Sequence, residues 1–320
     1  MKEISKMLFK SSPLNPLNYY IHGVSFYMKR EDLLPKYFGG NKVRILASIF
    51  SEIGIQDITR VVSFGSRHSN HIRVLAAMMF ERGIPCDLII LDDESKKSIT
   101  EGNELLATLY NANIHFCPSN EAREYIDSHL CNLKRQGEKA LFIPGGGHSA
   151  DGANGYVLAV DEIIDQTRGL DIDCIFLPTG TGTTQTGLIF GSKLRNCDVK
   201  IIGVTVARSP ERCKKEIGSL LNELNKRYDT ELSFNDDDIE VIDNSEKPYG
   251  AIDKDIVDTI RAVAKSDGIV LDPIYNAKTF WKMERLIEDK EYFSYKNILY
   301  LNTGGTPNIF TKGFSEALRQ

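Results

Sequence analysis

The sequence predicts an α/β fold with mostly parallel sheets flanked by helices. Short apolar runs typical of buried strands alternate along the chain with longer segments of helical periodicity. The runs are almost continuously apolar, as expected of strands that helices cover on both faces of a sheet. Alternation of this kind is typical of parallel sheets whose strands are connected by helices.

Several elements can be predicted individually. Strands are expected at residues 61–64, 87–91, 140–143, 174–177, 200–204 and 297–301. Long helices are expected at residues 71–82, 153–166 and 252–266, and a shorter one at 43–50. In these segments, apolar residues recur every three to four positions and mark one buried face.

Composition limits the class of protein. The chain has 320 residues, of which 42% are hydrophobic and 26% charged, so we expect about two domains with an ordinary globular core. The net charge of −5 argues against a general nucleic-acid surface or a surface for anionic membranes. No apolar run approaches membrane-spanning length, and the six cysteines are irregularly spaced. The N-terminal segment lacks the apolar core of a signal peptide, so a cytoplasmic protein is expected.

The segment TGTGTTQTG at residues 179–187 predicts a phosphate site between a strand and a helix. Its glycines let the backbone approach a ligand, and a helix start offers unpaired N–H groups. The segment lacks the lysine of a Walker loop, and Gln185 stands where a dinucleotide fingerprint has its third glycine. The phosphate of a smaller cofactor is therefore favoured. A turn that binds no ligand is the alternative.

Lys42 is a candidate nucleophile. It follows Gly39 and Gly40 at the start of a predicted helix, where its side chain could project into a cleft. Burial there would lower the pKa of its amine and suit it to Schiff-base chemistry with a carbonyl compound. A surface lysine near a turn is the alternative.

The segment GSRHSNH at residues 65–71 follows the first predicted strand. Ser69 or Asn70 would make an ordinary helix N-cap, although α/β proteins also build sites in such loops. His68 and His71 are three residues apart, but no neighbouring cysteine or carboxylate completes a ligand set, so no metal site is predicted. The segments DPIYNAK at 272–278 and NTGG at 302–305 would pass as ordinary loops by themselves.

Together and in this order, the segments resemble the pyridoxal-phosphate (PLP) enzymes of the D-cysteine desulfhydrase and 1-aminocyclopropane-1-carboxylate (ACC) deaminase family. The motifs GGNK, SNH, GTTQTG, DPIY and NTGG carry the resemblance, which runs from about Lys29 to Gly305. It implies the two-domain fold of tryptophan synthase β, known as fold type II. Residues 1–46 and 151–320 would form a large PLP-binding domain, and residues 47–150 a small domain. It also implies a homodimer.

The resemblance assigns roles to individual residues. Lys42 would hold PLP covalently and later move the Cα proton of the substrate. The other catalytic residues would be Ser69, Tyr275 and Tyr249, of which Tyr249 is the less specific match. The other cofactor contacts would come from Asn70, Thr181, Gly182, Thr183, Thr184 and Thr303. Asn70 would meet the pyridoxal hydroxyl, Thr303 the pyridine nitrogen and the Gly/Thr loop the phosphate. Ser69, Asn70 and His71 would contact the substrate.

Two positions favour the desulfhydrase branch. His71 is the desulfhydrase variant of the SNH motif, and Asn276 stands where ACC deaminases resemble Asp-Pro-Val-Tyr-Glu. A neutral group near the pyridine nitrogen weakens the electron sink, and expelling a thiolate needs less help than opening a cyclopropane. We therefore expect α,β-elimination on a small amino acid such as D-cysteine, giving a 2-oxo acid and ammonia. The alternatives are ACC deamination, β-replacement, a catalytically silent module and a non-enzymatic phosphate-binding module.

The chain departs from the family pattern at two places. Ile45 stands where relatives usually have a basic residue, so one cationic contact near the phosphate is expected to be lost. Arg67 and His68 replace an apolar residue and a glutamine just before Ser69. We expect both at the substrate pocket, and hence a substrate more anionic or bulkier than cysteine.

Overall fold

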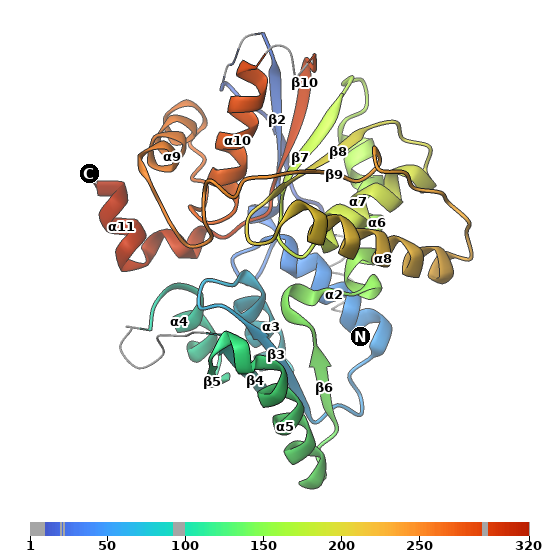
Figure 1. The fold of residues 1–320 in the computed structure, drawn as a ribbon, viewed down its shortest axis with the longest axis vertical. Helices are drawn as coiled ribbons and strands as arrows, with labels where there is room; N and C mark the ends of the chain where they lie inside the picture. Colours follow the sequence, from blue (N-terminus) through green and yellow to red (C-terminus); the bar gives the residue numbers. More distant parts are fainter. Residues whose placement is uncertain (1–9, 20, 22, 92–99, 290–293, 320) are drawn as a thin grey trace.

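The computed structural model describes residues 10–19, 21, 23–91, 100–289 and 294–319. In this part of the chain, two β-sheets lie one above the other with helices around them (Figure 1). The strands are β1 (Leu14–Pro16), β2 (Ser25–Arg30), β3 (Arg60–Gly65), β4 (Cys86–Leu91), β5 (Asn113–Cys117), β6 (Ala140–Ile143), β7 (Cys174–Thr179), β8 (Lys200–Thr205), β9 (Glu240–Ile242) and β10 (Asn297–Asn302).

The helices alternate with the strands as the sequence predicts. The α-helices are α2 (Asn41–Ile53), α3 (Asn70–Phe80), α4 (Gly102–Leu109), α5 (Ala122–Arg135), α6 (Ala150–Gln166), α7 (Thr183–Leu194), α8 (Pro210–Tyr228), α9 (Lys254–Asp267), α10 (Asn276–Glu288) and α11 (Lys312–Arg319). Short 3₁₀ turns are η1 (Glu31–Leu33), η2 (Ser119–Glu121), η3 (Gly145–Gly147) and η4 (Thr306–Phe310).

The two sheets draw on different parts of the chain. The larger sheet has the order β1-β2-β10-β7-β8-β9, and all its pairings are parallel except that of β1 with β2. The smaller sheet has the order β5-β4-β3-β6 and is parallel throughout. Strand β2, near the N-terminus, lies beside β10, near the C-terminus, so the larger sheet joins both ends of the described chain.

The predicted α/β class is confirmed, and all six predicted strands are present. Strands β1, β2, β5 and β9 were not predicted. Strand β2 lacks an apolar run because it contains Lys29, whose buried amine forms an ion pair with Glu162 of α6. The predicted helices correspond to α2, α3, α6 and α9, with shifted ends.

A buried ion network fixes the start of α2 against the larger sheet. Arg44 of α2 donates from Nε to Glu31 at 2.7 Å and from Nη2 to Glu162 at 2.9 Å. Burial alone would raise the pKa of Glu31, but the charges of Arg44 and Lys29 and the hydrogen bonds from Arg44 and Ser12 together lower it. Tyr156 of α6 donates to the same carboxylate at 2.8 Å. A displacement of α2 would separate these buried charges and leave each without a partner, which is strongly destabilising. The ion network therefore fixes the orientation of α2.

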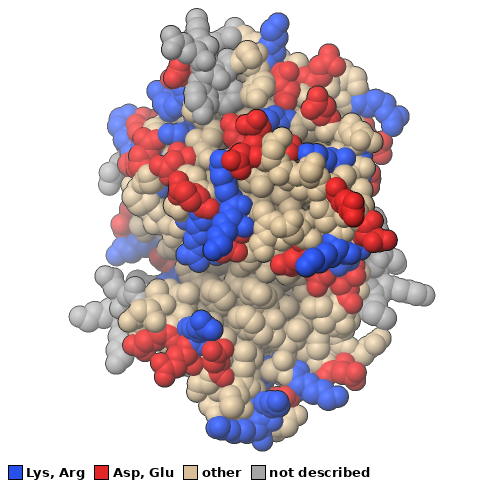
Figure 2. All heavy atoms as spheres, turned by 45° about the vertical axis from the view of Figure 1, so that its right-hand side comes forward, with Lys and Arg blue, Asp and Glu red and all other residues tan. Residues whose placement is uncertain are grey.

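The core and the surface follow from this arrangement. One apolar cluster runs from β3 of the smaller sheet through α2, α6 and α7 to β10, and a second lies under α9 and α10. Figure 2 shows acidic and basic side chains interspersed on the face it presents, rather than a continuous basic stripe. The six cysteines are free thiols. Among the described helices, none has the length and apolarity that a membrane crossing requires.

Candidate active site

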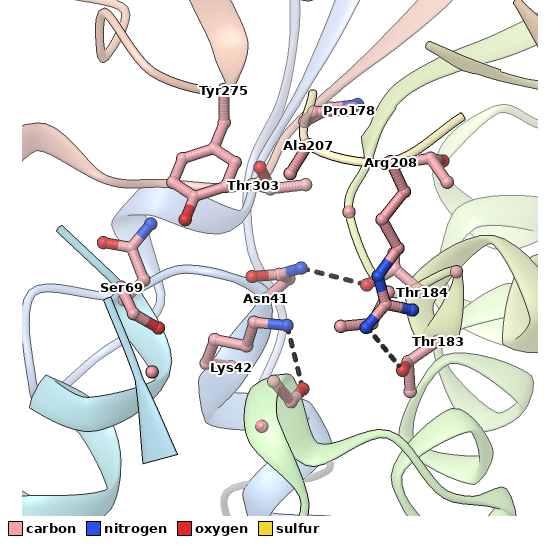
Figure 3. A pocket seen from close by; sticks show the side chains of 18 of the residues that line it. Asn41, Lys42, Ser69, Pro178, Thr183, Thr184, Ala207, Arg208, Tyr275 and Thr303 are labelled. Carbon is pink, nitrogen blue, oxygen red and sulfur yellow. Dashed lines mark hydrogen bonds between the residues drawn. The ribbon is translucent and has the colours of Figure 1, made fainter. Parts of the chain in front are cut away.

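A cavity of about 330 Å³ lies where the carboxyl ends of strands from both sheets meet. Ligand sites of parallel α/β proteins form at such strand ends. The lining comes from the start of α2, the loops after β3, β7, β8 and β10, turn η3, and two tyrosines before and after α9. Figure 3 shows Lys42 and Asn41 in the middle, Ser69 and Tyr275 on one side, and Thr183 and Thr184 on the other.

Lys42 projects into this cavity from the first turn of α2. Gly40 precedes the helix with a φ of 97°, and a Cβ there would lie 2.8 Å from the carbonyl oxygen of Thr303. Only glycine accommodates both conditions. Lys42 Nζ donates to the carbonyl of Gly146 at 2.9 Å. Burial, with a contribution from the charge of Arg208, lowers the pKa of the amine to about 8, so a useful fraction is neutral and nucleophilic.

The Gly/Thr loop forms an anion cradle at the start of α7. Gly182, the residue before the helix, has a φ of 83°, and no acidic residue stands in the first turn. The hydroxyls of Thr181 and Thr183 are hydrogen-bonded at 2.9 Å, and Asn41 Nδ2 donates to Thr184 Oγ1 at 3.0 Å. Backbone N–H groups, hydroxyls and the positive end of α7 therefore converge on one part of the cavity.

Two tyrosines and a serine form a chain of hydroxyl groups at the opposite side. The hydroxyls of Tyr249 and Tyr275 are 2.8 Å apart, and Ser66 Oγ is 2.9 Å from that of Tyr249. All three residues line the cavity. Burial raises the pKa of both tyrosines, so both remain protonated at neutral pH and can donate to a bound molecule.

Thr303 lines the cavity and is held from behind by Asn276. The backbone N–H of Thr303 donates to Asn276 Oδ1 at 3.0 Å, while Asn276 Nδ2 donates to Asp272 and to the carbonyl of Gly304, each at 2.7 Å. Asn276 is fully buried and is not a lining residue. The polar group that this chain presents at that end of the cavity is therefore the neutral hydroxyl of Thr303.

Ser69 and Asn70 both line the cavity at the start of α3. Ser69 is the N-cap, with Oγ accepting from the backbone N–H of His71 at 3.3 Å. Asn70 Oδ1 accepts from Asn103 at 3.0 Å and from Arg73 at 3.4 Å. These bonds fix the amide so that its Nδ2 group is the donor still available to a ligand.

Three residues expected at the substrate are not among the lining residues. Arg67 forms an ion pair with Glu104 at 2.7 Å and stacks on the ring of Phe116. His68 packs against the ring of Phe314. His71 is fully buried, and its Nε2 lies 2.8 Å from Ser63 Oγ. The family resemblance suggested His71, and adjacency to Ser69 suggested Arg67 and His68. In the structure, His71 lies on the inward face of α3, and Glu104 neutralises Arg67.

Sequence reasoning gave no site role to five polar residues of the lining, namely Asn41, Ser66, Thr179, Gln185 and Arg208. Thr179 and Gln185 belong to the predicted phosphate segment at residues 179–187. Asn41 stands inside the GGNK motif but received no role. Ser66 lies in the segment that departs from the family pattern. Arg208 follows β8, and the rule that strand ends build the site would have identified its loop. Position 45 is a fully buried isoleucine, so the chain carries no cation there.

Among the described residues, one group outside the cavity has the composition of a metal site. Asp87, His115 and His129 have their ligand atoms within 4.8 Å of one another. However, Arg60 Nη1 donates to Asp87 Oδ1 at 2.8 Å, and His129 Nε2 lies 2.8 Å from Asp87 Oδ2. The guanidinium disfavours a second cation at that carboxylate, so we interpret the group as an ion-pair cluster.

The cavity residues fit a phosphorylated carbonyl cofactor. A buried amine of lowered pKa and an anion cradle face one space, and no acidic residue is among the described residues of its lining. Buried Nη1 of Arg208 has no hydrogen-bond partner in the described chain, as expected beside an anion site. These features define an enzyme that binds its cofactor through both a lysine and a phosphate. The chain belongs to the pyridoxal-phosphate dependent enzymes, whose family model matches residues 7–304.

Similar proteins carry two names. D-cysteine desulfhydrase of Yersinia pestis (strain Pestoides F) is 30% identical over 305 residues, 93% of this chain and 91% of its own. A Pyrococcus abyssi protein provisionally named 1-aminocyclopropane-1-carboxylate deaminase is 29% identical over 296 residues, 91% of this chain and 87% of its own. A crystal structure of an ACC deaminase homologue matches with a TM-score of 0.86 at 28% identity, covering 100% and 99% of the two chains.

Proposed function

We propose that the chain is a PLP-dependent lyase that catalyses α,β-elimination on a small amino acid, with D-cysteine as the model substrate. With water, D-cysteine would give pyruvate, hydrogen sulfide and ammonia. The hydroxyl chain of Ser66, Tyr249 and Tyr275 is the observation that carries the proposal. Its three hydroxyl groups line the cavity and are linked one to the next by hydrogen bonds of 2.9 and 2.8 Å. Figure 3 shows Tyr275 on the side of the cavity opposite Thr183 and Thr184, which belong to the proposed phosphate cradle.

Each residue has a proposed task. Lys42 holds the cofactor and, once its amine is released, takes the Cα proton of the substrate on Nζ. Asn70 donates to the pyridoxal hydroxyl, and the loop 181–184 holds the phosphate. Ser69 orients the substrate carboxylate or amine. When bound, PLP supplies the conjugated ring that accepts the electron pair left on Cα.

The leaving group is expected to meet the tyrosines. Tyr275 donates a proton to the departing sulfur, and Tyr249 holds that hydroxyl in place through the 2.8 Å hydrogen bond. Thr303, a neutral group, meets the pyridine nitrogen. A neutral partner gives a weaker electron sink than a carboxylate, which favours a substrate with a good leaving group. Because Arg67 is paired with Glu104, a substrate with an anionic side chain is no longer favoured.

ACC deamination is the second candidate, since the Pyrococcus abyssi relative carries that name. ACC deamination opens the cyclopropane ring of its substrate, whereas α,β-elimination on D-cysteine breaks the bond between Cβ and sulfur. Asn276 stands where ACC deaminases have a glutamate, and it accepts from the backbone N–H of Thr303. This neutral residue favours elimination over ring opening. A β-replacement reaction would use the same early steps and would need a second substrate.

The test is release of 2-oxo acid by purified protein from D-cysteine, L-cysteine and ACC, each supplied separately. We expect D-cysteine to give pyruvate and sulfide in equal amounts and ACC to give no product. Release of 2-oxobutanoate from ACC would identify the deaminase instead. Turnover that appears only with an added nucleophile would identify a replacement enzyme.

We also propose the division into domains and the state of assembly. The smaller sheet lies wholly within the proposed small domain, residues 47–150, and the strands of the larger sheet lie within 1–46 and 151–320. A cytoplasmic homodimer is proposed. Free cysteines agree with a reducing compartment. Exposed apolar side chains on α3, α4 and η4 offer an interface, namely Phe80, Leu109 and Phe310.

A further inference from the structure

In the described part of the chain, the cavity contains positive charge that no lining carboxylate balances. Among the described residues that line it, Lys42 and Arg208 carry cationic side chains, and none is acidic. Lys42 donates to a backbone carbonyl. After burial, the charge of Arg208 is the second cause of the lowered pKa of Lys42, so the two cations lie close enough to repel. An anion bound in the cavity would relieve this repulsion.

Arg208 has a donor ready for such an anion. In the described chain, its Nη1 is buried and has no hydrogen-bond partner, an arrangement that is costly unless a ligand supplies the acceptor. Glu216 contributes an attractive charge, but its carboxylate is hydrogen-bonded to His148 Nε2 at 2.9 Å. Among the described residues, no carboxylate forms an ion pair with the half-buried Arg208 side chain, and its buried Nη1 stays without an acceptor.

The position of Arg208 indicates which anion it meets. Figure 3 shows the guanidinium beside Thr183 and Thr184 at the start of α7, away from Ser69 and Tyr275. His148 Nδ1 lies 3.3 Å from Thr183 Oγ1 and supports the same corner. Neutral groups, Ser69 and Tyr275, thus line the proposed substrate side of the cavity, and the guanidinium of Arg208 faces the proposed phosphate cradle.

We propose that Arg208 binds the phosphate of PLP through its free Nη1 donor and is the cationic partner of the Thr181–Thr184 cradle. The inference rests on the proposed placement of the phosphate at this loop. A guanidinium suits the task, because its planar donors match phosphate oxygens and it keeps its charge at every working pH. Lys42 is unavailable as the counter-charge, since its amine is committed to the cofactor carbonyl.

The test compares PLP with pyridoxal, which lacks the phosphate. In a Lys42→Ala background both ligands bind without a covalent bond, so calorimetry gives true dissociation constants. Adding Arg208→Ala should raise the dissociation constant of PLP by about 10- to 100-fold, the usual value of a hydrogen bond to a charged group. The constant for pyridoxal should change by less than about twofold. Arg208→Lys should restore part of the loss.

Arg212→Ala is the matched control. Arg212 lies in the first turn of α8, four residues after Arg208, and is exposed and not a lining residue, so its loss should leave both constants within about twofold. If the Arg208→Ala variant does not fold, Arg208→Gln replaces it in the same binding comparison, with its fold checked by circular dichroism. Phosphorus NMR gives a second readout: the resonance of bound PLP should begin to titrate near about pH 6 only when Arg208 is replaced.

Two results would overturn the inference. Equal weakening of PLP and pyridoxal would mean that Arg208 supports the fold of the cavity rather than the phosphate. Unchanged binding of PLP would mean that the guanidinium does not reach it. If the unsubstituted protein itself fails to bind PLP, the proposed placement of the cofactor falls with it, so the two failures are distinguishable.

Discussion

Replacing Tyr275 by phenylalanine tests the proposed proton donor by removing one hydroxyl and keeping the ring. In the variant, the hydroxyl of Tyr249 keeps its 2.9 Å hydrogen bond to Ser66, so the cavity should remain intact. A positioned proton donor accelerates a reaction by about 10² to 10⁴, and the lower end applies here because the raised pKa of Tyr275 makes it a weaker acid. We therefore expect kcat/KM for D-cysteine to fall about 100-fold, or about 2.7 kcal/mol of transition-state stabilisation.

The leaving group decides whether the hydroxyl acts as an acid. β-Chloro-D-alanine loses chloride, which needs no proton, so its kcat/KM should fall by less than about fivefold in Tyr275→Phe. Both substrates give pyruvate and can be followed in the same coupled assay. Tyr249→Phe is the matched control, and we expect a smaller loss for D-cysteine because Tyr275 remains. Equal losses for thiol and chloride would refute the reasoning.

Three further predictions concern protonation and the loop. The pKa of Lys42 is lowered to about 8, so below that pH the rate of PLP capture should rise about tenfold per pH unit, and a flat stopped-flow profile would contradict this. Gly182→Ala, whose Cβ would lie 2.7 Å from Ile217, should lower the free energy of unfolding in urea by about 1–3 kcal/mol. In the control Gly180→Ala, the new Cβ would meet only the side chain of Val206, at 3.7 Å, and the free energy of unfolding should fall by less than about 0.5 kcal/mol. Equal losses in the two variants would argue against strain at Gly182. Burial lowers the pKa of His71 to about 3, so the unfolded state binds the extra proton and stability should fall as the pH drops below about 6.5. His71→Gln should reduce this slope, by up to about 1.4 kcal/mol per pH unit, in unfolding series at several pH values; an unchanged slope would count against a neutral His71.

The sequence predicts the parallel strands well because their burial on both faces leaves an unbroken apolar run. Strand β7 and its Gly/Thr loop are the clearest example, since the run, the glycines and the helix start follow one another directly. Strand β2 could not be predicted in this way. Its Lys29 is neutralised by Glu162, which is 133 residues away in the sequence.

The candidate site shows the same limit at the level of side chains. The motif residues Lys42, Ser69 and Tyr275 lie in the cavity because each stands at a strand end or helix start. Arg67 does not, because Glu104, on a separate helix, draws its guanidinium away. Arg208 escaped prediction because nothing in its local sequence shows that its Nη1 is buried without an acceptor in the described structure. Partners distant in sequence decide where a charged side chain points.

The most direct test of the account is the identity of the lysine that binds PLP. The protein would be mixed with PLP, reduced with borohydride and digested, and the modified peptide identified by mass spectrometry. Lys278 is an internal control: burial also lowers its pKa to about 8, but it donates to backbone carbonyls and is not in the cavity lining. We predict modification at Lys42 and its absence in Lys42→Ala. Modification at Lys278 or another lysine, with Lys42 unmodified, would contradict the central claim.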